Sequence, residues 1–232
     1  MTVALITGAN KGIGFETARH LTQAGYVVYL GARDTERGEK AAAEIGARFV
    51  QLDVTDDASV AAALATVEKD EGHLDVLVNN AGTIGTQDRL DGPTALSVFD
   101  INAIGIVRVT EAALPLLRRA ENPRIVNVSS SLGSFWANTT PGRVEHGMFI
   151  PFYAASKAAA SMLTVQYAKE YPGIRINAVE PGPTNTDMTA GYGIKDIAQS
   201  PEESAKTVVR LATIGPDGPT GTLQDKDGTL AW

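Results

Sequence analysis

The fold is decided by the stretch Val3-Ala-Leu-Ile-Thr-Gly-Ala-Asn-Lys-Gly-Ile-Gly14. Its first four residues are apolar without alternation, which indicates a strand buried on both faces. Glycines then lead into a helical stretch that starts at Gly12. Such a turn lets the backbone approach a pyrophosphate, and the helix N-terminus offers free N–H groups and a positive dipole end. The glycine spacing differs from the usual dinucleotide fingerprint, so an ordinary tight turn stays an alternative, while Lys11 before Gly12 does not fit a P-loop.

The same alternation of apolar runs and helical stretches continues along the chain. Expected strands cover residues 3–6, 26–30, 48–52, 75–78, 124–128 and 175–179, and expected helices cover residues 12–24, 35–45, 57–70, 95–119 and 153–171. Alternation of this kind predicts βαβ units. We therefore expect an α/β protein made of a single doubly wound, Rossmann-type domain over residues 1–232, with a parallel sheet flanked by helices on both faces. Residues 132–152 and 183–201 are loop-rich and are expected to form the substrate loops.

Composition narrows the possible partners. The chain has 232 residues, 44% of them hydrophobic, a formal net charge of −7 and no cysteine. An acidic surface does not attract nucleic acid or anionic membrane non-specifically. The lack of cysteine excludes disulfides and thiolate chemistry. We expect a cytoplasmic protein without a metal site, without a nucleic-acid or membrane partner, and either monomeric or homo-oligomeric.

Four motifs follow one another in an order typical of a known family. They are the glycine turn at residues 7–14, Asn79-Asn80-Ala81-Gly82, Tyr153-Ala-Ala-Ser-Lys157 and Pro181-Gly182. Together they resemble the short-chain dehydrogenase/reductase family over essentially the whole chain. The segments at residues 31–38 and 74–82 are most similar to those of NADPH-dependent carbonyl reductases. The resemblance implies an oxidoreductase that uses a nicotinamide cofactor.

The residues after the second expected strand favour NADP(H). An NAD site usually places an acidic side chain on the ribose there, whereas an NADP site places arginine on the 2′-phosphate. By resemblance the acid's position is Ala32, and Arg33 follows it. With Lys11 and Arg37, three cations are expected to converge on that phosphate. Asp34 counts against this interpretation, unless it caps the following helix.

The predicted cofactor site combines this argument with the family's motifs. Its residues are Gly8, Asn10, Lys11, Gly12, Ile13, Gly14, Arg33, Arg37, Asp53, Val54, Asn80, Ala81, Gly82, Tyr153, Lys157, Pro181, Gly182, Thr184 and Thr186.

Tyr153 and Lys157 are the central catalytic candidates. Four residues apart on a helix, they share a face. A tyrosine is a weak acid near neutrality, and a nearby ammonium is expected to pull its pKa down. Resemblance adds Ser130, whose hydroxyl would bind the substrate oxygen, and Asn102 as a structural asparagine that holds water or the lysine.

These residues predict a reductase that transfers hydride from NADPH to a ketone or aldehyde carbonyl, with tyrosine as proton donor. Two alternatives stay open: an NAD-dependent alcohol dehydrogenase of the same fold, and a cofactor-sensing protein without catalysis. The substrate is a small-molecule carbonyl or alcohol that the sequence does not identify. Trp136, Phe149 and Trp232 either line its pocket or plug the core.

Overall fold

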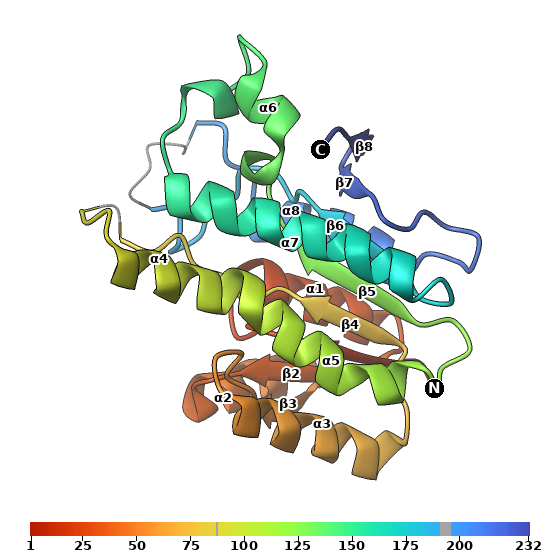
Figure 1. Cartoon of the computed structure of the whole chain (residues 1–232). Helices are drawn as coiled ribbons and strands as arrows, with labels where there is room; N and C mark the ends of the chain where they lie inside the picture. The colour runs from red at the N-terminus through yellow and green to blue at the C-terminus, as the bar shows by residue number, and fades with distance from the viewer. Residues whose placement is uncertain (87, 191–195) are drawn as a thin grey trace.

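A single sheet runs through the middle of the computed structural model, which describes residues 1–86, 88–190 and 196–232 (Figure 1). The strand order is β3-β2-β1-β4-β5-β6-β7-β8, and neighbours are parallel except β7 and β8, which are antiparallel. The strands are β1 (Val3–Ile6), β2 (Val27–Ala32), β3 (Arg48–Gln51), β4 (Val76–Asn79), β5 (Arg124–Val128), β6 (Arg175–Val179), β7 (Leu223–Asp225) and β8 (Gly228–Leu230). The order reverses at β1, between β2 and β4, where doubly wound sheets bind their ligands.

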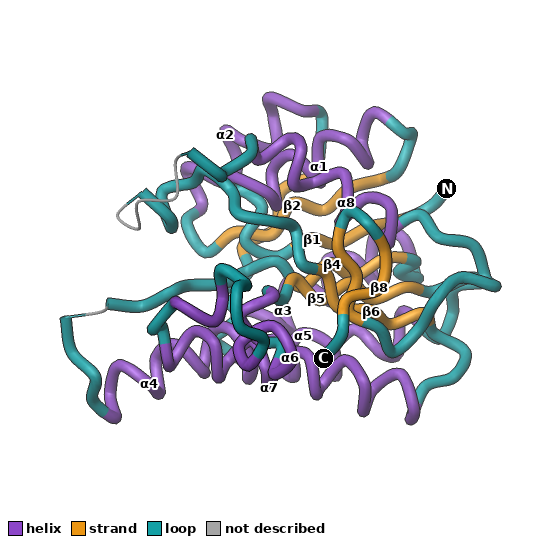
Figure 2. The backbone as a smooth tube through the Cα atoms, turned by 90° about the horizontal axis from the view of Figure 1, so that it is seen from above, coloured by secondary structure: helices purple, strands orange, loops and turns teal. Residues whose placement is uncertain are grey.

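Helices cover both faces of this sheet, as the view from above shows (Figure 2). One layer holds α1, α2 and α8, and the other holds α3, α4, α5 and α7. The helices are α1 (Gly12–Gln23), α2 (Thr35–Ile45), α3 (Asp57–Glu71), α4 (Gly92–Phe99), α5 (Gly105–Leu117), α6 (Phe135–Thr139), α7 (Pro151–Glu170) and α8 (Pro201–Ala212). No helix among the described residues is long and apolar enough to cross a membrane.

The alternating directions of the β1 side chains explain why helices must cover both faces of the sheet. Val3 and Leu5 pack in one apolar cluster with residues of α3 and α5. Ala4 and Ile6 pack in a second cluster with residues of α1, α2 and α8. Successive side chains of a strand point to opposite faces, so an uninterrupted apolar strand requires a core on each side. All four residues are fully buried.

The six expected strands are all present, with ends that differ by at most two residues. The sequence interpretation missed α6, α8, β7 and β8. The expected parallel sheet flanked by helices is confirmed, and β8 is added antiparallel at its edge. The signal for α8 was present in Ser200-Pro-Glu-Glu203, because the Ser200 hydroxyl accepts a hydrogen bond from the Glu203 N–H as an N-cap. The signal for the last hairpin was the turn Asp225-Lys-Asp-Gly228.

The expected helix at residues 95–119 is interrupted. A π-helical turn at Asp100–Ile104 separates α4 from α5. At Gly105 an added Cβ would lie 3.0 Å from the Val54 side chain, so glycine allows α5 to approach the loop after β3 closely. Asn102 lies inside the π-helical turn and is buried, and such turns often occur at functional sites.

Candidate active site

The glycine turn after β1 is held by the loop after β4. The Thr7 hydroxyl accepts hydrogen bonds from the backbone N–H groups of Asn80 and Ala81, both at 3.0 Å. The Asn80 amide donates to the carbonyl oxygens of Thr7 and Gly8, at 2.9 and 3.0 Å. Gly8 has φ of 62°, and an added Cβ would lie 2.9 Å from Cα of Ala81. The predicted Asn80 therefore acts here as a brace for the turn.

The N-terminus of α1 keeps the features of an anion site. Its N-cap residue Lys11 makes no side-chain cap hydrogen bond, so the first N–H groups of the helix are not capped by that side chain. Gly12 has φ of 62°, and an added Cβ would lie 3.6 Å from Thr186 Cγ2. The loop after β6 thus faces the turn, and an exposed ion pair joins the two loops between Lys11 Nζ and Asp187 Oδ2 at 2.7 Å.

The three predicted cations act on nearby carboxylates in this structure. Lys11, and at longer range Arg37, lower the pKa of Asp187. Burial would raise the pKa of Asp53, but hydrogen bonds from Thr55 and the charge of Arg33 lower it.

Asp34 is the N-cap of α2. Its Oδ1 accepts a hydrogen bond from the Arg37 N–H at 3.0 Å, and its Oδ2 lies 3.6 Å from Arg37 Nε. Capping of this kind satisfies a free N–H of the helix and opposes the dipole charge. The structure therefore supports the capping interpretation of Asp34.

Ser130, Tyr153 and Lys157 come together at the carboxyl end of β5. Ser130 follows the strand, and Tyr153 and Lys157 lie in the first turns of α7. The Ser130 hydroxyl interacts with Tyr153, and the Lys157 ammonium lies 5.6 Å from the centre of the Tyr153 ring. Lys157 is buried and donates to the Val128 carbonyl oxygen at 2.6 Å. The helical spacing read from the sequence is thus confirmed as a shared face.

Glycine brings this cluster together. An added Cβ at Gly133 would lie 2.6 Å from the backbone carbon of Lys157, so the short 3₁₀ turn Ser131–Gly133 packs directly on α7. At Gly82 an added Cβ would lie 3.4 Å from Asn102 Oδ1 and 3.5 Å from Lys157 Nζ. The loop that braces the glycine turn therefore also reaches the lysine.

Asn102 holds the backbone of a neighbouring loop. Its Oδ1 accepts from the Thr83 N–H at 2.8 Å, and its Nδ2 donates to the Thr83 carbonyl oxygen and to the Ser156 hydroxyl. The expected direct hold on the lysine is not among its hydrogen bonds. Asn102 instead ties α7 to the loop after β4, because Ser156 precedes Lys157 on that helix.

The expectation about the acidity of Tyr153 is wrong for this structure. Burial, and then the negative charge of Glu180, raise the pKa of Tyr153 well above its ordinary value, and the Ser130 hydrogen bond offsets this only in part. Burial lowers the pKa of Lys157 to about 8, against the opposing charge of Glu180. An ammonium over the ring does not outweigh desolvation and a nearby carboxylate.

Glu180 is the residue that the sequence interpretation missed. It follows β6 directly and immediately precedes the predicted Pro181-Gly182 motif. Its Oε2 accepts from the Ser131 N–H, and its Oε1 accepts from the Gly182 N–H at 2.9 Å. A signal was available, because a charged residue after a buried strand lies at the edge where ligands bind.

Comparison with known proteins settles the class. The model of the short chain dehydrogenase family matches residues 2–196. The chain belongs to this family. It is an enzyme family of oxidoreductases that act on carbonyl or alcohol substrates with a nicotinamide cofactor.

Individual relatives cover nearly the whole chain. The chain is 33% identical to (-)-isopiperitenone reductase from Mentha piperita, over 98% of this chain and 97% of the relative. It is 32% identical to salutaridine reductase from Papaver bracteatum, over 97% of this chain and 94% of the relative. The NADPH-bound carbonyl reductase from chicken fatty liver superposes with a TM-score of 0.86 at 28% identity, over 100% of both chains. The predicted likeness of this short-chain dehydrogenase to carbonyl reductases is thereby confirmed.

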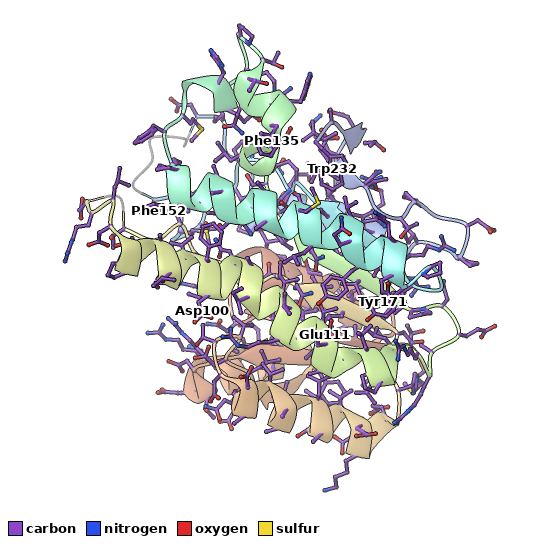
Figure 3. All side chains as sticks on the ribbon, viewed as in Figure 1. Asp100, Glu111, Phe135, Phe152, Tyr171 and Trp232 are labelled. Atoms are coloured by element: carbon purple, nitrogen blue, oxygen red, sulfur yellow. The ribbon has the colours of Figure 1, made fainter. Side chains whose placement is uncertain are left out.

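The aromatic residues of the predicted substrate loops are exposed to different degrees. Phe135 and Phe149 are 74% and 75% exposed, which excludes a role as core plugs. Trp136 and Trp232 are 42% and 38% exposed, and the backbone N–H of Trp136 donates to the Trp232 carbonyl oxygen. Figure 3 shows Phe135 and Trp232 at neighbouring elements, α6 and the end of the chain beyond β8. Of the second loop, residues 191–195 lie outside the described residues.

The Thr184 side chain is engaged inside the protein. Its hydroxyl bonds to Ser204 of α8 at 2.6 Å and donates to the Gly182 carbonyl oxygen, and the residue is buried. Its side chain therefore stabilises the loop after β6 against α8. Among the predicted hydroxyls of that loop, Thr186 is the one that faces the glycine turn.

Proposed function

We propose that the protein reduces a ketone or aldehyde carbonyl with NADPH, and that Tyr153 donates the proton to the developing alcohol. The observation that carries the proposal is the cluster of Ser130, Tyr153 and Lys157 at the strand ends beside the glycine turn. A site of this kind places a proton donor, a hydroxyl and a cation around one point.

The residues fit a dinucleotide at the turn after β1. Close backbone approach at Gly8, the uncapped N-terminus of α1 and the facing Thr186 suit a diphosphate. When bound, NADPH supplies the hydride. We propose that the cofactor-site residues named in the sequence analysis hold NADPH. Among them, Asn80 acts by bracing the glycine turn, and Thr184 acts through its backbone.

Preference for NADPH is supported at the end of β2. Ala32 occupies the position where an NAD site usually carries an acidic residue, so no negative charge lies there, and Arg33 follows it. Asp34, the residue that would favour NAD, is engaged in capping α2. A structural relative, the carbonyl reductase from chicken fatty liver, binds NADPH.

The state of Tyr153 suits reduction. A raised pKa keeps the phenol protonated near neutrality, and the protonated form is the one that can donate. With the hydride supplied to the carbonyl carbon, Tyr153 would pass its phenolic proton to the carbonyl oxygen, which would leave an alcohol and a phenolate. The Lys157 cation stabilises that phenolate, and solvent returns the proton. The Ser130 hydroxyl orients the carbonyl oxygen by a hydrogen bond.

The first test is Tyr153→Phe, measured by oxidation of NADPH with a carbonyl panel. Loss of the general acid is expected to lower kcat by about 10²–10⁴-fold, with NADPH binding retained by fluorescence titration. A Tyr153→Phe protein with native turnover contradicts the mechanism. Native protein that binds NADPH but turns over no panel member supports the sensing alternative.

The second test compares NADPH and NADH affinity in Arg33→Ala. Loss of a charged contact to the 2′-phosphate is expected to weaken NADPH binding by about 10–100-fold, with NADH binding unchanged. Lys226→Ala is the matched control, because Lys226 is an exposed cation in the β7–β8 turn, paired with Asp227. Equal loss for both cofactors, or a native preference for NADH, supports the NAD-dependent dehydrogenase instead.

A further inference from the structure

Arg108 of α5 is a largely buried cation to which the proposed function gives no role. Its side chain is 20% exposed. Its Nη1 donates to the Val54 carbonyl oxygen at 3.1 Å and lies 2.8 Å from Asp100 Oδ1. Its Nε lies 3.1 Å from Asp57 Oδ1. The planar fork of donors on a guanidinium lets one side chain reach all three groups.

The three partners of Arg108 come from different parts of the fold. Val54 belongs to the turn after β3, Asp57 opens α3, and Asp100 begins the π-helical turn. Figure 3 shows Asp100 at the bend where α4 meets α5. The Asp57 side chain is 87% exposed, so its ion pair adds little. The main effect of Arg108 is therefore to tie the turn after β3 to the start of α5.

The turn after β3 is packed closely against α5 at this point. Val54 is buried, and an added Cβ at Gly105 would lie 3.0 Å from its side chain. Within the turn, Asp53 Oδ1 accepts hydrogen bonds from the N–H and the hydroxyl of Thr55, at 2.9 and 2.7 Å. These inner bonds give the turn its shape, whereas the contacts of Arg108 and Gly105 fix where it lies against the helix.

The strand order indicates which half of a dinucleotide this turn would meet. The glycine turn follows β1, and Ser130 of the proposed catalytic cluster follows β5, on the β4 side of β1. A cofactor with its diphosphate at the glycine turn and its nicotinamide toward β5 extends its adenosine half the other way, across the ends of β2 and β3. Arg33 and Asp53, which follow these two strands, line one hollow of about 470 Å³.

We propose that Arg108 is a positioning residue, which holds the turn at Asp53 and Val54 in place for the adenosine half of the cofactor. The inference rests on the proposed function, because it takes a nicotinamide dinucleotide to lie along these strand ends. Arg108 touches neither cofactor nor substrate in this account. It acts through the backbone of Val54.

The catalytic end of the site has supports of its own. Asn102 shares the π-helical turn with Asp100, but its amide group is held by the backbone of Thr83 and by the Ser156 hydroxyl. These bonds do not involve Arg108. Its loss is therefore expected to weaken the binding of adenosine and to spare the chemistry of the bound complex.

Arg108→Met is the test, because methionine keeps much of the buried stem and removes every polar contact. The fluorescence of the reduced nicotinamide gives dissociation constants for NADPH, for NADH and for reduced nicotinamide mononucleotide, which has no adenosine. The first two constants are expected to rise by the same factor, about tenfold, because a turn that is no longer held must be ordered on binding. The constant for the mononucleotide should not change.

Two further results distinguish this effect from others. At saturating NADPH, kcat should stay within about twofold of the native value, as expected when a mutation weakens the ground state and the transition state alike. The equal loss for NADPH and NADH also differs from the result expected for Arg33→Ala, which weakens NADPH alone.

Arg119→Met is the matched control. Arg119 follows α5 and also joins it to α3, through a hydrogen bond to the Gly72 carbonyl oxygen at 3.0 Å and an ion pair with Glu68 at 2.9 Å. Gly72 is the C-cap of α3, at the opposite end of that helix from the turn after β3. The control removes the same kinds of contact between the same two helices and should leave all three dissociation constants unchanged.

If Arg108→Met does not fold, Arg108→Lys serves in its place, because it keeps the charge but lacks the planar fork, and the same pattern is expected at smaller magnitude. In either variant, native affinity for both dinucleotides overturns the proposal. An equal loss for the mononucleotide, or an equal loss in Arg119→Met, also overturns it, since the fold would then be weakened in general. A native protein that binds none of the three compounds overturns the proposed function, and this inference with it.

Discussion

Thr7→Val tests whether the glycine turn depends on the loop that braces it. Valine has the shape of threonine, so it leaves no cavity, but it removes the oxygen that accepts from the N–H groups of Asn80 and Ala81. The Asn80 N–H keeps a second acceptor in the Val78 carbonyl oxygen at 3.1 Å. The Ala81 N–H keeps none among the hydrogen bonds of the described residues.

One unsatisfied backbone donor beside a fully buried side chain costs about 1–3 kcal/mol. For a chain of 232 residues a loss of about 2 kcal/mol corresponds to a fall in Tm of about 4–8 °C. NADPH affinity should fall too, by about tenfold or less, because the turn is no longer held in its binding conformation. Thermal unfolding and fluorescence titration measure the two effects.

Thr213→Val is the matched control. Thr213 is exposed at the end of α8, where its hydroxyl donates to the Val209 carbonyl oxygen. The same change there should alter the free energy of unfolding by no more than about 0.5 kcal/mol. If Thr7→Val unfolds at the same temperature as Thr213→Val and binds NADPH like the native protein, the account of the turn is wrong.

Three further predictions concern single residues. Gly8→Ala should destabilise the protein by more than Gly46→Ala. Both glycines have positive φ, but only at Gly8 would an added Cβ lie close to another backbone atom, 2.9 Å from Cα of Ala81. If both variants lose the same free energy of unfolding, about 1–2 kcal/mol each, that close contact is unimportant. Lys157→Met should abolish activity yet stabilise the protein near pH 7, since burial lowers the pKa of Lys157 to about 8 from 10.5 and the native residue therefore opposes folding below that range. The gain, at most roughly 3 kcal/mol, should shrink as pH rises through this window, and denaturant unfolding that shows the same difference at every pH would contradict it. Asp34→Ala should lower the free energy of unfolding by about 0.5–2 kcal/mol, because the helix loses its N-cap, and it should leave the ratio of NADPH to NADH affinity unchanged. A large change in that ratio would show that Asp34 binds the cofactor ribose.

The sequence pattern predicted those features that depend on residues close together in the chain. The buried strands could be found because a parallel strand with two covered faces has no polar alternation. Tyr153 and Lys157 could be paired because helical spacing alone puts them on one face. The π-helical turn around Asn102 could not be predicted, since the partners that Asn102 binds there, Thr83 and Ser156, are remote in the sequence.

The acidity of Tyr153 could not be predicted, because it depends on burial and on charges from residues that are distant in the sequence. The sequence placed Lys157 near Tyr153 but could not show that Glu180 lies there too, because the two come from α7 and the end of β6. Desolvation of the phenol likewise arises only once the chain has packed.

The central place of β1 has a consequence for how the molecule opens. Only β1 connects β2 with β4, so its loss would divide the sheet into two separate parts. Residues early in a chain commonly fray first, but Val3–Ile6 are fully buried and bonded on both sides. Their amide hydrogens should therefore exchange with solvent only when the whole protein unfolds, and their exchange rates would report its global stability.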